Sequence, residues 1–551
     1  MNIKYNRRVI SVYCFFVFLF IILALKIFYL QVFKSSFFQS LADNQHYRLL
    51  RLEGKRGSIF DCQGRILARG LNYYSIFADP KLIENPLETA KILALNLGLS
   101  EESLVDKFNK KKRFAWIKRK VGLEDKEKIK SFKLKGIGFI REQKRFYPQD
   151  ELSSSFVGFV DIDNKGVEGL ELFYNSYLSG KDGWVRVMQD SMSREVALSS
   201  QIITPHRGAD IALTVDAQIQ YWAQYYLKEA INKFKAKSGS VVIMDALSGG
   251  IIALVDYPSF NPNELNEESL KNIRNRAVCD MFEPGSVFKA VTLAAAVSGD
   301  KFLNEDKIFC ENGKLKIPGT TLHDWKSYGE LSFEEVFMKS SNIGVGKIVQ
   351  AIGPACLYDY IKRLGFGRLT GIDLPGETKG SLKPLSSWSK TSEYIIPIGQ
   401  EIGVNLIQLV GAFAAIVNGG YSVKPHLVEN ICSQGFCKSI AVEKKRVISS
   451  SAAQRAKNIL IKVVEEGTGK RAGIKERKIG GKTGTAQKYD PKTKRYSLNG
   501  YRANFIGFLA DSNPPLVIGI TVDEPKVSRF GGVVAAPIFK EITQKIIQSM
   551  N

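Results

Sequence analysis

The stretch FEPGSVFKAVTLAAAVSG, residues 282–299, joins a polar start to a run of small apolar residues. Pro284 and Gly285 are typical of the beginning of a helix, and a glycine typical of a helix end closes the stretch. The pattern predicts a buried helix that carries Ser286 at its N-terminus and Lys289 three residues later on the same face. A capping serine and a solvated lysine explain an isolated S-x-x-K equally simply, so the rest of the chain must decide.

The pairing of these two residue types has a chemical use. A serine hydroxyl is a poor nucleophile until a base takes its proton, and a desolvated lysine can be that base. Free lysine titrates near ~10.4, so a base near neutrality needs a drop of roughly three units, or about 4 kcal/mol. Burial against an apolar helix and a neighbouring cation can supply this drop. The helix N-terminus also directs backbone N–H groups at developing negative charge.

The same tripeptide spacing occurs twice more. Ser298 and Lys301 fall at the predicted end of the helix, and Ser387 and Lys390 fall in a polar loop. Neither copy follows a strand and opens a helix, so neither is predicted to form a reactive pair.

Two further motifs follow in the chain. KSSNIGVGKIVQAIG (339–353) places an S-x-N just before a helical run, and IGGKTGTAQ (479–487) places a K-T-G on a predicted strand. Chance copies of both exist, at 497–499 and 237–239, but they stand in the wrong order relative to the other motifs. A lone S-x-N most often caps a helix, and a lone K-T-G fits an ordinary edge strand. The three motifs in order, each in a fitting context, are specific. Their residues are Ser286, Lys289, Ser340, Ser341, Asn342, Lys482, Thr483, Gly484 and Thr485.

The ordered trio S-x-x-K, S-x-N and K-T-G resembles the signature of penicillin-binding proteins and serine β-lactamases. FEPGSVFK, KSSNIGVG, GGKTGTAQK and FGGVVAAPIFKEI (530–542) resemble class B penicillin-binding proteins, the monofunctional peptidoglycan D,D-transpeptidases. RGSIFD (56–61), KRFYP (144–148) and GVEGLE (166–171) are similar to the non-catalytic module of that class. Cys62-Gln63 stands where the family often has Arg-Asn, and residues 405–407 are Asn-Leu-Ile where Thr-Pro-Leu is common.

The resemblance implies a role for each matching residue. The implied catalytic residues are Ser286 as nucleophile, Lys289 as its base, Ser340 as proton relay to the leaving amine, Asn342 as holder of the substrate amide and Lys289, and Lys482 as a cation. Lys482 is expected to keep Lys289 neutral and to attract the terminal carboxylate of a peptidoglycan stem, with Thr483, Gly484 and Thr485 as the substrate-binding strand. Backbone N–H groups of Ser286 and Thr485 would form the oxyanion hole. No metal and no cofactor is implied.

The predicted fold class is α+β. A strand that leads into an amphipathic helix is predicted within 210–234, and further strands are predicted within 238–257 and 477–524. With helices at 286–298, 333–364, 405–418 and 536–550, they suggest an antiparallel sheet sandwiched by helices. Before this domain, 34–55 reads as a polar helical approach from the anchor, 56–68 as a short hairpin, 80–135 as helical and 136–210 as loop-rich. The RGSIFD and GVEGLE segments are interpreted as structural glycines and buried salt-linked pairs.

An apolar run near the N-terminus predicts a membrane anchor. Residues 9–25 are uncharged and apolar, and IFYLQVF extends them beyond the ~25 Å that seventeen helical residues span. Three basic residues precede the run, which favours a cytoplasmic N-terminus, and no cleavage site follows. The expected organisation is a tail at 1–8, an anchor at 9–33, a non-catalytic module at 34–208 and a transpeptidase domain at 209–551.

Composition agrees with an exported globular protein. The 551 residues are 44% hydrophobic and 24% charged, and the net charge is +23. An exported chain seldom meets DNA, so the basic tract at 107–120 is interpreted as a solvated surface or a contact with anionic wall or lipid. Cys432 and Cys437 can close a small disulfide loop in an oxidising compartment, although free buried cysteines fit equally well.

By resemblance, the protein is expected in the bacterial inner membrane as a single-pass protein with its catalytic domain outside the cytosol. Stem peptides and β-lactams are the implied ligands, and a glycan polymerase and divisome membrane proteins are the implied partners. The length and the KTGTAQK strand are most like the division-specific septal transpeptidase. An elongation-specific enzyme, a non-catalytic division scaffold, and a β-lactamase or β-lactam sensor are the alternatives.

Overall fold

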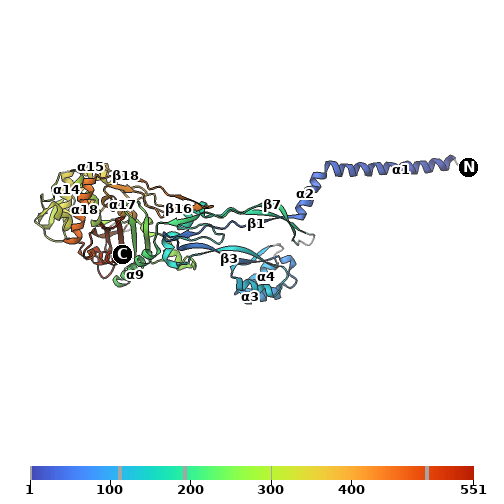
Figure 1. The fold of residues 1–551 in the computed structure, drawn as a ribbon, viewed down its shortest axis with the longest axis horizontal. Coiled ribbons are helices and arrows are strands. Elements are labelled where there is room, and N and C mark those ends of the chain that lie inside the picture. The colour runs from blue at the N-terminus through green and yellow to red at the C-terminus, as the bar shows by residue number, and fades with distance from the viewer. Residues whose placement is uncertain (1–2, 110–113, 190–194, 300, 491–494, 551) are drawn as a thin grey trace. The chain divides into compact units, whose positions relative to one another are not determined.

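A computed structural model describes residues 3–109, 114–189, 195–299, 301–490 and 495–550 (Figure 1). The chain divides into two compact units, each made of two segments. The first comprises residues 1–55 and 180–207, and the second comprises residues 56–179 and 208–551.

The first unit contains the apolar N-terminal helix. Helix α1 (Ile3–Phe28) continues through one π-helical turn, η1 (Tyr29–Phe33). The apolar helical stretch Asn6–Phe33 has 28 residues, which is long and apolar enough to cross a membrane, and it fits a single-pass anchor. Helix α2 (Ser35–His46) and an antiparallel sheet of order β1-β6-β7 complete the unit, with β1 at Tyr47–Leu52, β6 at Gly183–Gln189 and β7 at Glu195–Ile203.

A five-stranded antiparallel sheet forms the centre of the second unit, in the order β10-β9-β21-β20-β19. Side chains alternate between its faces. On β9, Val241 and Ile243 join one hydrophobic core with α9 and α19, whereas Val242 and Met244 join the other core with α12 and α17. The predicted α+β sandwich is confirmed. The strands are β9 (Ser238–Asp245), β10 (Ile251–Tyr257), β19 (Ile479–Asp490), β20 (Arg495–Leu509) and β21 (Leu516–Asp523).

Helices cover both faces of this sheet. One face packs against α9 (Ala217–Phe234) and α19 (Gly531–Met550), and the other against α17 (Leu406–Val417). Helix α17 approaches closely at Gly519, where a Cβ atom would lie 2.5 Å from the Val410 side chain. Further helices lie on the α17 side: α12 (Lys289–Ser298), α13 (Phe333–Met338), α14 (Asn342–Ile352), α15 (Pro354–Arg363) and α18 (Ser450–Glu465). Short helices α10 (Glu267–Asn272), α11 (Arg276–Cys279) and α16 (Ser392–Ile395) connect them.

The helical part of this unit also contains three two-stranded antiparallel sheets. They pair β11 with β14, β12 with β13 and β15 with β18. Their bounds are β11 (Lys307–Phe309), β14 (Glu330–Ser332), β12 (Lys314–Ile317), β13 (Thr320–His323), β15 (Tyr421–Val423) and β18 (Lys444–Arg446).

A second sheet has the order β17-β16-β8-β2-β3-β4, with β5 also paired to β3. Most of its strands come from the N-terminal part of this unit, and β16 and β17 come from residues 428–439. Its strands are β2 (Ile59–Phe60), β3 (Ile66–Ala78), β4 (Ala115–Val121), β5 (Ile137–Phe146), β8 (Asp210–Leu213), β16 (Val428–Ser433) and β17 (Phe436–Ser439). A small core joins β3 and β4 to α3 (Pro86–Leu97), α4 (Glu101–Asn109) and α5 (Leu123–Ser131). The remaining short helices are α6 (Ser154–Val157), α7 (Gly169–Phe173) and α8 (Asn175–Leu178).

The predicted hairpin at 56–68 is present as β2 and β3, but three local predictions differ from the structure. Strand β4 interrupts the region predicted as helical, β1 ends the helical approach after the anchor, and β5 lies in the region predicted as loops. These strands carry several Lys and Arg side chains and lack a clear alternating pattern, so pairing with distant strands stabilises them. Residues 110–113 of the basic tract lie outside the described residues.

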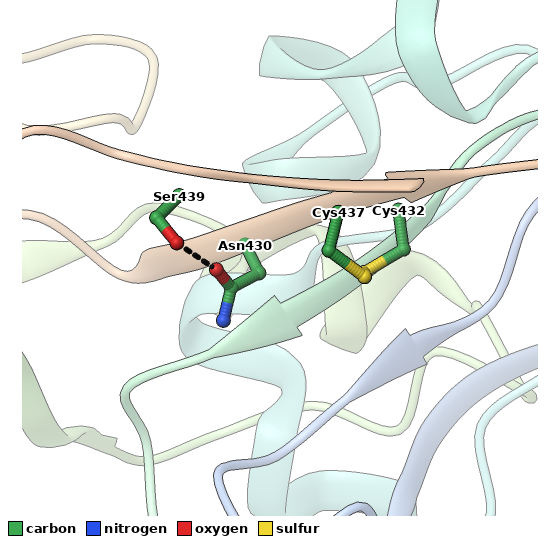
Figure 2. The surroundings of a disulfide bond; sticks show 4 residues. All are labelled: Asn430, Cys432, Cys437 and Ser439. Atoms are coloured by element: carbon green, nitrogen blue, oxygen red, sulfur yellow. Dashed lines mark hydrogen bonds between the residues drawn. A yellow bond between two sulfur atoms is a disulfide. The ribbon is translucent and has the colours of Figure 1, made fainter. Parts of the chain in front are cut away.

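A disulfide joins Cys432 on β16 to Cys437 on β17, which settles the alternative that the sequence left open (Figure 2). The two residues are direct partners across the ribbon. On the same face, the Ser439 hydroxyl donates a hydrogen bond of 2.6 Å to Asn430 Oδ1. Two neighbouring cross-strand pairs therefore fix the register of this exposed ribbon.

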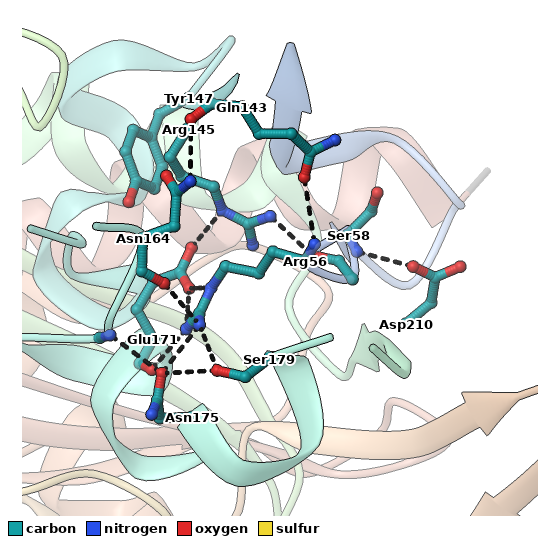
Figure 3. A network of polar contacts seen from close by, with 12 residues as sticks. Arg56, Ser58, Gln143, Arg145, Tyr147, Asn164, Glu171, Asn175, Ser179 and Asp210 are labelled. Carbon is teal, nitrogen blue, oxygen red and sulfur yellow. Dashed lines mark hydrogen bonds and ion pairs between the residues drawn. The ribbon is translucent and has the colours of Figure 1, made fainter. Parts of the chain in front are cut away.

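A buried ion-pair network links the RGSIFD, KRFYP and GVEGLE segments (Figure 3). Arg56 Nε donates to Glu171 Oε2 at 2.7 Å, and Arg145 Nε donates to Glu171 Oε1 at 2.6 Å. The three side chains are no more than 3% exposed. Arg56 also donates to Asn175 Oδ1 and the Ser179 hydroxyl. The interpretation of these segments as buried salt-linked pairs agrees with this geometry.

We expect Glu171→Gln to lower the free energy of unfolding by about 3–5 kcal/mol, because it leaves two buried guanidinium groups without a counter-charge. Urea titration of the full chain in detergent, followed by circular dichroism, measures the change. The matched control is Glu84→Gln, which breaks an ion pair with Lys135 between side chains that are 71% and 72% exposed. Because exposed pairs contribute little, this control should change stability by under about 1 kcal/mol. Equal effects of the two variants would contradict a structural role for the network.

Candidate active site

The predicted nucleophile lies in a tight turn beside the sheet edge. Residues Gly285–Phe288 form a single 3₁₀ turn, η4, which leads directly into α12. In a 3₁₀ turn residues i and i+3 eclipse each other, so Ser286 and Lys289 share one side of the helix start. Gly285 has φ +58°, a conformation that favours glycine, and a Cβ atom there would lie 3.0 Å from the Thr485 carbonyl oxygen. The S-x-x-K turn thus rests directly on the strand that carries the K-T-G.

The same contact explains the glycine of the K-T-G motif. A Cβ atom at Gly484 would lie 2.6 Å from the Val287 side chain and 2.9 Å from the Pro284 carbonyl oxygen. Any larger residue at 484 would push the η4 turn away from β19, the edge strand of the central sheet. Asn504 on the neighbouring strand β20 also donates a hydrogen bond of 3.3 Å to Pro284 O.

The two lysines and the S-x-N loop meet in one hydrogen-bonded cluster. Lys289 Nζ donates to Ser340 O at 2.8 Å and to Asn342 Oδ1 at 2.7 Å, and it lies 3.2 Å from Ser340 Oγ. Lys482 Nζ donates to Ser340 Oγ at 2.9 Å. Four predicted catalytic residues, from three segments far apart in the sequence, are therefore joined by direct hydrogen bonds that converge on Ser340 and Lys289.

Burial sets the protonation state of both amines. Lys289 and Lys482 are fully buried. Burial lowers the pKa of Lys289 well below its usual range, the charge of Lys482 lowers it further, and Asp324 acts in the opposite direction. Burial also lowers the pKa of Lys482 to about 7. Burial is thus the main cause of a neutral Lys289, and the charge of Lys482 comes second. Both causes were expected from the sequence.

A neutral amine at Lys289 is arranged to accept a proton. Such an amine has two hydrogens and one lone pair. Carbonyl oxygens only accept hydrogen bonds, so Ser340 O and Asn342 Oδ1 take both hydrogens. The lone pair stays available for a hydroxyl hydrogen, from either Ser286 or Ser340.

The two threonines of the K-T-G-T segment differ in their hydrogen bonding. Thr483 Oγ1 donates to Thr468 Oγ1 at 3.2 Å. Thr485 Oγ1 instead accepts a hydrogen bond of 3.2 Å from Gly531 N. The hydroxyl hydrogen of Thr485 is therefore left to donate to a ligand, whereas that of Thr483 is directed at Thr468.

The structure separates the true motif from its copies. Ser298 Oγ donates to Ala294 O within its own helix, and Lys301 Nζ donates to Ala351 O. Lys390 lies 3.7 Å from Glu393. Neither copy forms a serine–lysine contact within the part of the chain that the structure describes.

Sequence reasoning missed three residues of the site: Asp324, Thr468 and Asn504. Each contacts a predicted residue or its turn, through hydrogen bonds to Asn342, Thr483 and Pro284 respectively. None belongs to a recognisable motif, and each lies 15 or more residues from its partner in the sequence. Only homologous sequences or the fold itself could have pointed to them.

An antiparallel sheet between helices, with S-x-x-K at the start of a buried helix and K-T-G on the edge strand, defines the class of active-site serine proteins that recognise penicillin. The comparisons with known proteins agree. The protein-family model described as "Penicillin binding protein transpeptidase domain" matches residues 239–544, and the model described as "Penicillin-binding Protein dimerisation domain" matches residues 51–213.

Curated relatives match along almost the whole chain. Stage V sporulation protein D of Bacillus subtilis is 34% identical over 98% of this chain and 85% of its own length. Peptidoglycan D,D-transpeptidase FtsI of Escherichia coli is 30% identical over 96% of this chain and 89% of its own length. Penicillin binding protein 3 from Mycobacterium tuberculosis, in a structure complexed with aztreonam, is 27% identical with a TM-score of 0.72, covering 91% of this chain and 97% of that one.

The chain belongs to the class B penicillin-binding proteins, and its transpeptidase domain is of the serine acyl-transferase type. Members of the family bind β-lactams, as the complexes with aztreonam and ampicillin show.

Proposed function

We propose that this protein is a membrane-anchored peptidoglycan D,D-transpeptidase that cross-links stem peptides through an ester on Ser286. The observation that carries the proposal is the buried amine of Lys289, whose hydrogens bind Ser340 O and Asn342 Oδ1 at the end of the Ser286 turn. Relatives named peptidoglycan D,D-transpeptidases support the substrate class.

In the acylation step, Ser286 Oγ attacks the carbonyl carbon of the penultimate D-alanine while its proton passes to Lys289 Nζ. The tetrahedral intermediate collapses as the C–N bond to the terminal D-alanine breaks. Ser340 Oγ, in contact with both lysine amines, relays a proton to the leaving amine. D-Alanine departs and the peptide stays on Ser286 as an ester.

In the second step, an amine from another stem attacks the ester carbonyl and Ser286 takes back a proton as it leaves. The new amide is the cross-link. Backbone N–H groups of Ser286 and Thr485 are our candidates for the oxyanion hole, which contributes ~3–4 kcal/mol per donor to the transition state. The contact between η4 and β19 supports this choice because it brings the two backbones together.

Lys482 and Thr485 are our candidates for the terminal carboxylate of the stem. A bound carboxylate favours the ammonium form of Lys482, whose pKa of about 7 makes it responsive to such a charge. Thr485 retains a hydroxyl hydrogen to donate, and Thr483 supports the strand through Thr468. We assign Gly484 to the close approach of the two segments.

The proposed function includes a cellular role, a location in the membrane and partner proteins. We propose septal synthesis, supported by the likeness to FtsI along 96% of the chain, and we keep an elongation role as the alternative. Residues 9–33, within the helix Asn6–Phe33, would anchor the chain in the inner membrane, with residues 1–8 in the cytoplasm and the transpeptidase domain, 209–551, outside it. A glycan polymerase and divisome membrane proteins are the proposed partners, and nucleic acid is not.

Fluorescent penicillin tests the activity class. The purified full chain in detergent should form one covalent adduct that persists through gel electrophoresis and turns over slowly, because water is a poor substitute for the acceptor amine. A synthetic stem peptide that ends in D-Ala-D-Ala, added with an amine acceptor, should release D-alanine. Rapid loss of label would indicate a β-lactamase, and no labelling at all would indicate a scaffold; either result would contradict the proposal.

A further inference from the structure

Three consecutive residues, the last of strand β13 and the first two of the loop after it, hold the S-x-N loop. His323 O accepts a hydrogen bond of 2.7 Å from Asn342 Nδ2, and Trp325 Nε1 donates one of 2.9 Å to Lys339 O. Asp324, between them, accepts from the residues at the start of α14. The loop from 339 to 343 is thus held at both ends and in the middle by one short segment.

The carboxylate of Asp324 makes most of these contacts. Its Oδ2 accepts from Ser341 Oγ at 2.6 Å, and its Oδ1 accepts from Asn342 N and from Ile343 N. Ser341 Oγ in turn accepts from Gly344 N and caps α14. A negative charge at the N-terminus of a helix is favourable, so Asp324 both orients the loop and stabilises the helix that follows it.

The loop needs such support because its reactive residue is held in an unfavourable conformation. Ser340 has φ +58°, a region that costs a non-glycine residue free energy and that persists only where the surrounding structure imposes it. This conformation presents both Ser340 O and Ser340 Oγ to Lys289. Without the support of Asp324, the loop is free to relax to an ordinary backbone conformation and withdraw these two atoms.

We propose that Asp324 is a positioning residue for acyl transfer, which holds the S-x-N loop so that Ser340 O and Asn342 Oδ1 bind the two hydrogens of the Lys289 amine. The inference rests on the proposed function of the site. It assigns to the loop after β13 a part in the reaction, although Asp324 itself does not touch the nucleophile turn through any hydrogen bond among the described residues.

Asp324 also acts on Lys289 through its charge. The charged groups that influence Lys289 are Lys482, from β19, and Asp324, from the loop after β13. The two have opposite effects, because a nearby anion favours the ammonium form of Lys289 and a nearby cation disfavours it. Geometry and charge are therefore largely separable. Alanine at 324 removes both, whereas asparagine removes the charge, keeps one oxygen to accept from Asn342 N and Ile343 N, and places an amide N–H donor opposite Ser341 Oγ.

The experiment measures the second-order rate of labelling by fluorescent penicillin from pH 5 to 10, with the full chain in detergent. The variants are Asp324→Ala and Asp324→Asn. Their matched controls are Glu330→Ala and Glu330→Gln, which remove a carboxylate from an exposed residue six positions away in the same segment. In the parent, the rate should fall as the pH falls, because the ammonium form of Lys289 cannot take the serine proton.

We expect Asp324→Ala to lower the rate about 100-fold or more, since a displacement of about 1 Å can have that effect. At high pH, Asp324→Asn should label at a rate within about 10-fold of the parent's rate. The part of its pH profile in which the rate falls on acidification, the acid limb, should lie at lower pH than in the parent, because loss of the anion lowers the pKa of Lys289. Both Glu330 variants should follow the parent.

If Asp324→Ala does not fold, the pH shift of Asp324→Asn decides, since a merely structural aspartate would not move it. An acid limb unchanged in Asp324→Asn, or labelling of Asp324→Ala within threefold of the parent, would overturn the inference. A parent protein that does not label at all would instead refute the proposed function.

Discussion

Replacing Ser286 by alanine is expected to abolish covalent labelling by fluorescent penicillin and release of D-alanine from a stem peptide. Among the described residues, Ser340 is another hydroxyl close to Lys289, but its Oγ accepts a hydrogen bond of 2.9 Å from Lys482 Nζ, and we expect it not to replace Ser286 as the nucleophile. The variant should fold as the parent does. The Ser286 hydroxyl makes no hydrogen bond among the described residues, so its removal should change stability by no more than about 0.5 kcal/mol.

Ser387→Ala is the matched control for this variant, because Ser387 belongs to another S-x-x-K but lies exposed at the end of the 3₁₀ turn Leu385–Ser387. Gel fluorescence, with mass spectrometry of the labelled peptide, checks both proteins. The control should label fully, with the adduct on the peptide that contains Ser286. Undiminished labelling of Ser286→Ala would show that the nucleophile has been assigned wrongly.

Lys289→Met should lower the labelling rate by ~10²–10⁴-fold, the usual contribution of a positioned general base. Methionine has a similar length and fills the same buried space, but it has no lone pair basic enough to take the serine proton. The residual rate should also lose the dependence on pH that the lysine imposes. Stopped-flow measurement of labelling from pH 5 to 10 tests both statements.

Lys390→Met, from the second motif copy, is the control, since its amine lies 3.7 Å from Glu393 at an exposed position. Circular dichroism should show that Lys289→Met is folded, although Ser340 O and Asn342 Oδ1 each lose a donor. A labelling rate within threefold of the parent would exclude Lys289 as the base, and Ser340 would then be the next residue to change.

Much of the fold was predictable because its signals are local. The hairpin of β9 and β10, the amphipathic α9 and the apolar α12 and α17 each show a periodicity that identifies them within twenty residues. Strands β1 and β4 were not predicted, because their partners β6 and β3 supply the stabilising contacts and lie elsewhere in the chain.

The residues of the candidate site also fall into two groups, those that a sequence motif identifies and those that only the fold brings to the site. Ser286 and Lys289 were recognisable because a helix start relates them directly, and the ordered motifs supplied Ser340, Asn342 and Lys482. Asp324 was not recognisable, because nothing in the sequence around it distinguishes it from other surface acids. Its importance comes from hydrogen bonds to residues 17 to 19 positions away.

The sequence by itself determined the family, the order of the motifs and the kind of chemistry, because residue types and their spacing encode these directly. Only the tertiary structure decided which serine–lysine pair meets the S-x-N, how burial lowers the pKa of two lysines, and why Ser340 adopts φ +58°. The physical reason is that burial and proximity arise from packing between segments 50 to 200 residues apart, which no local pattern specifies.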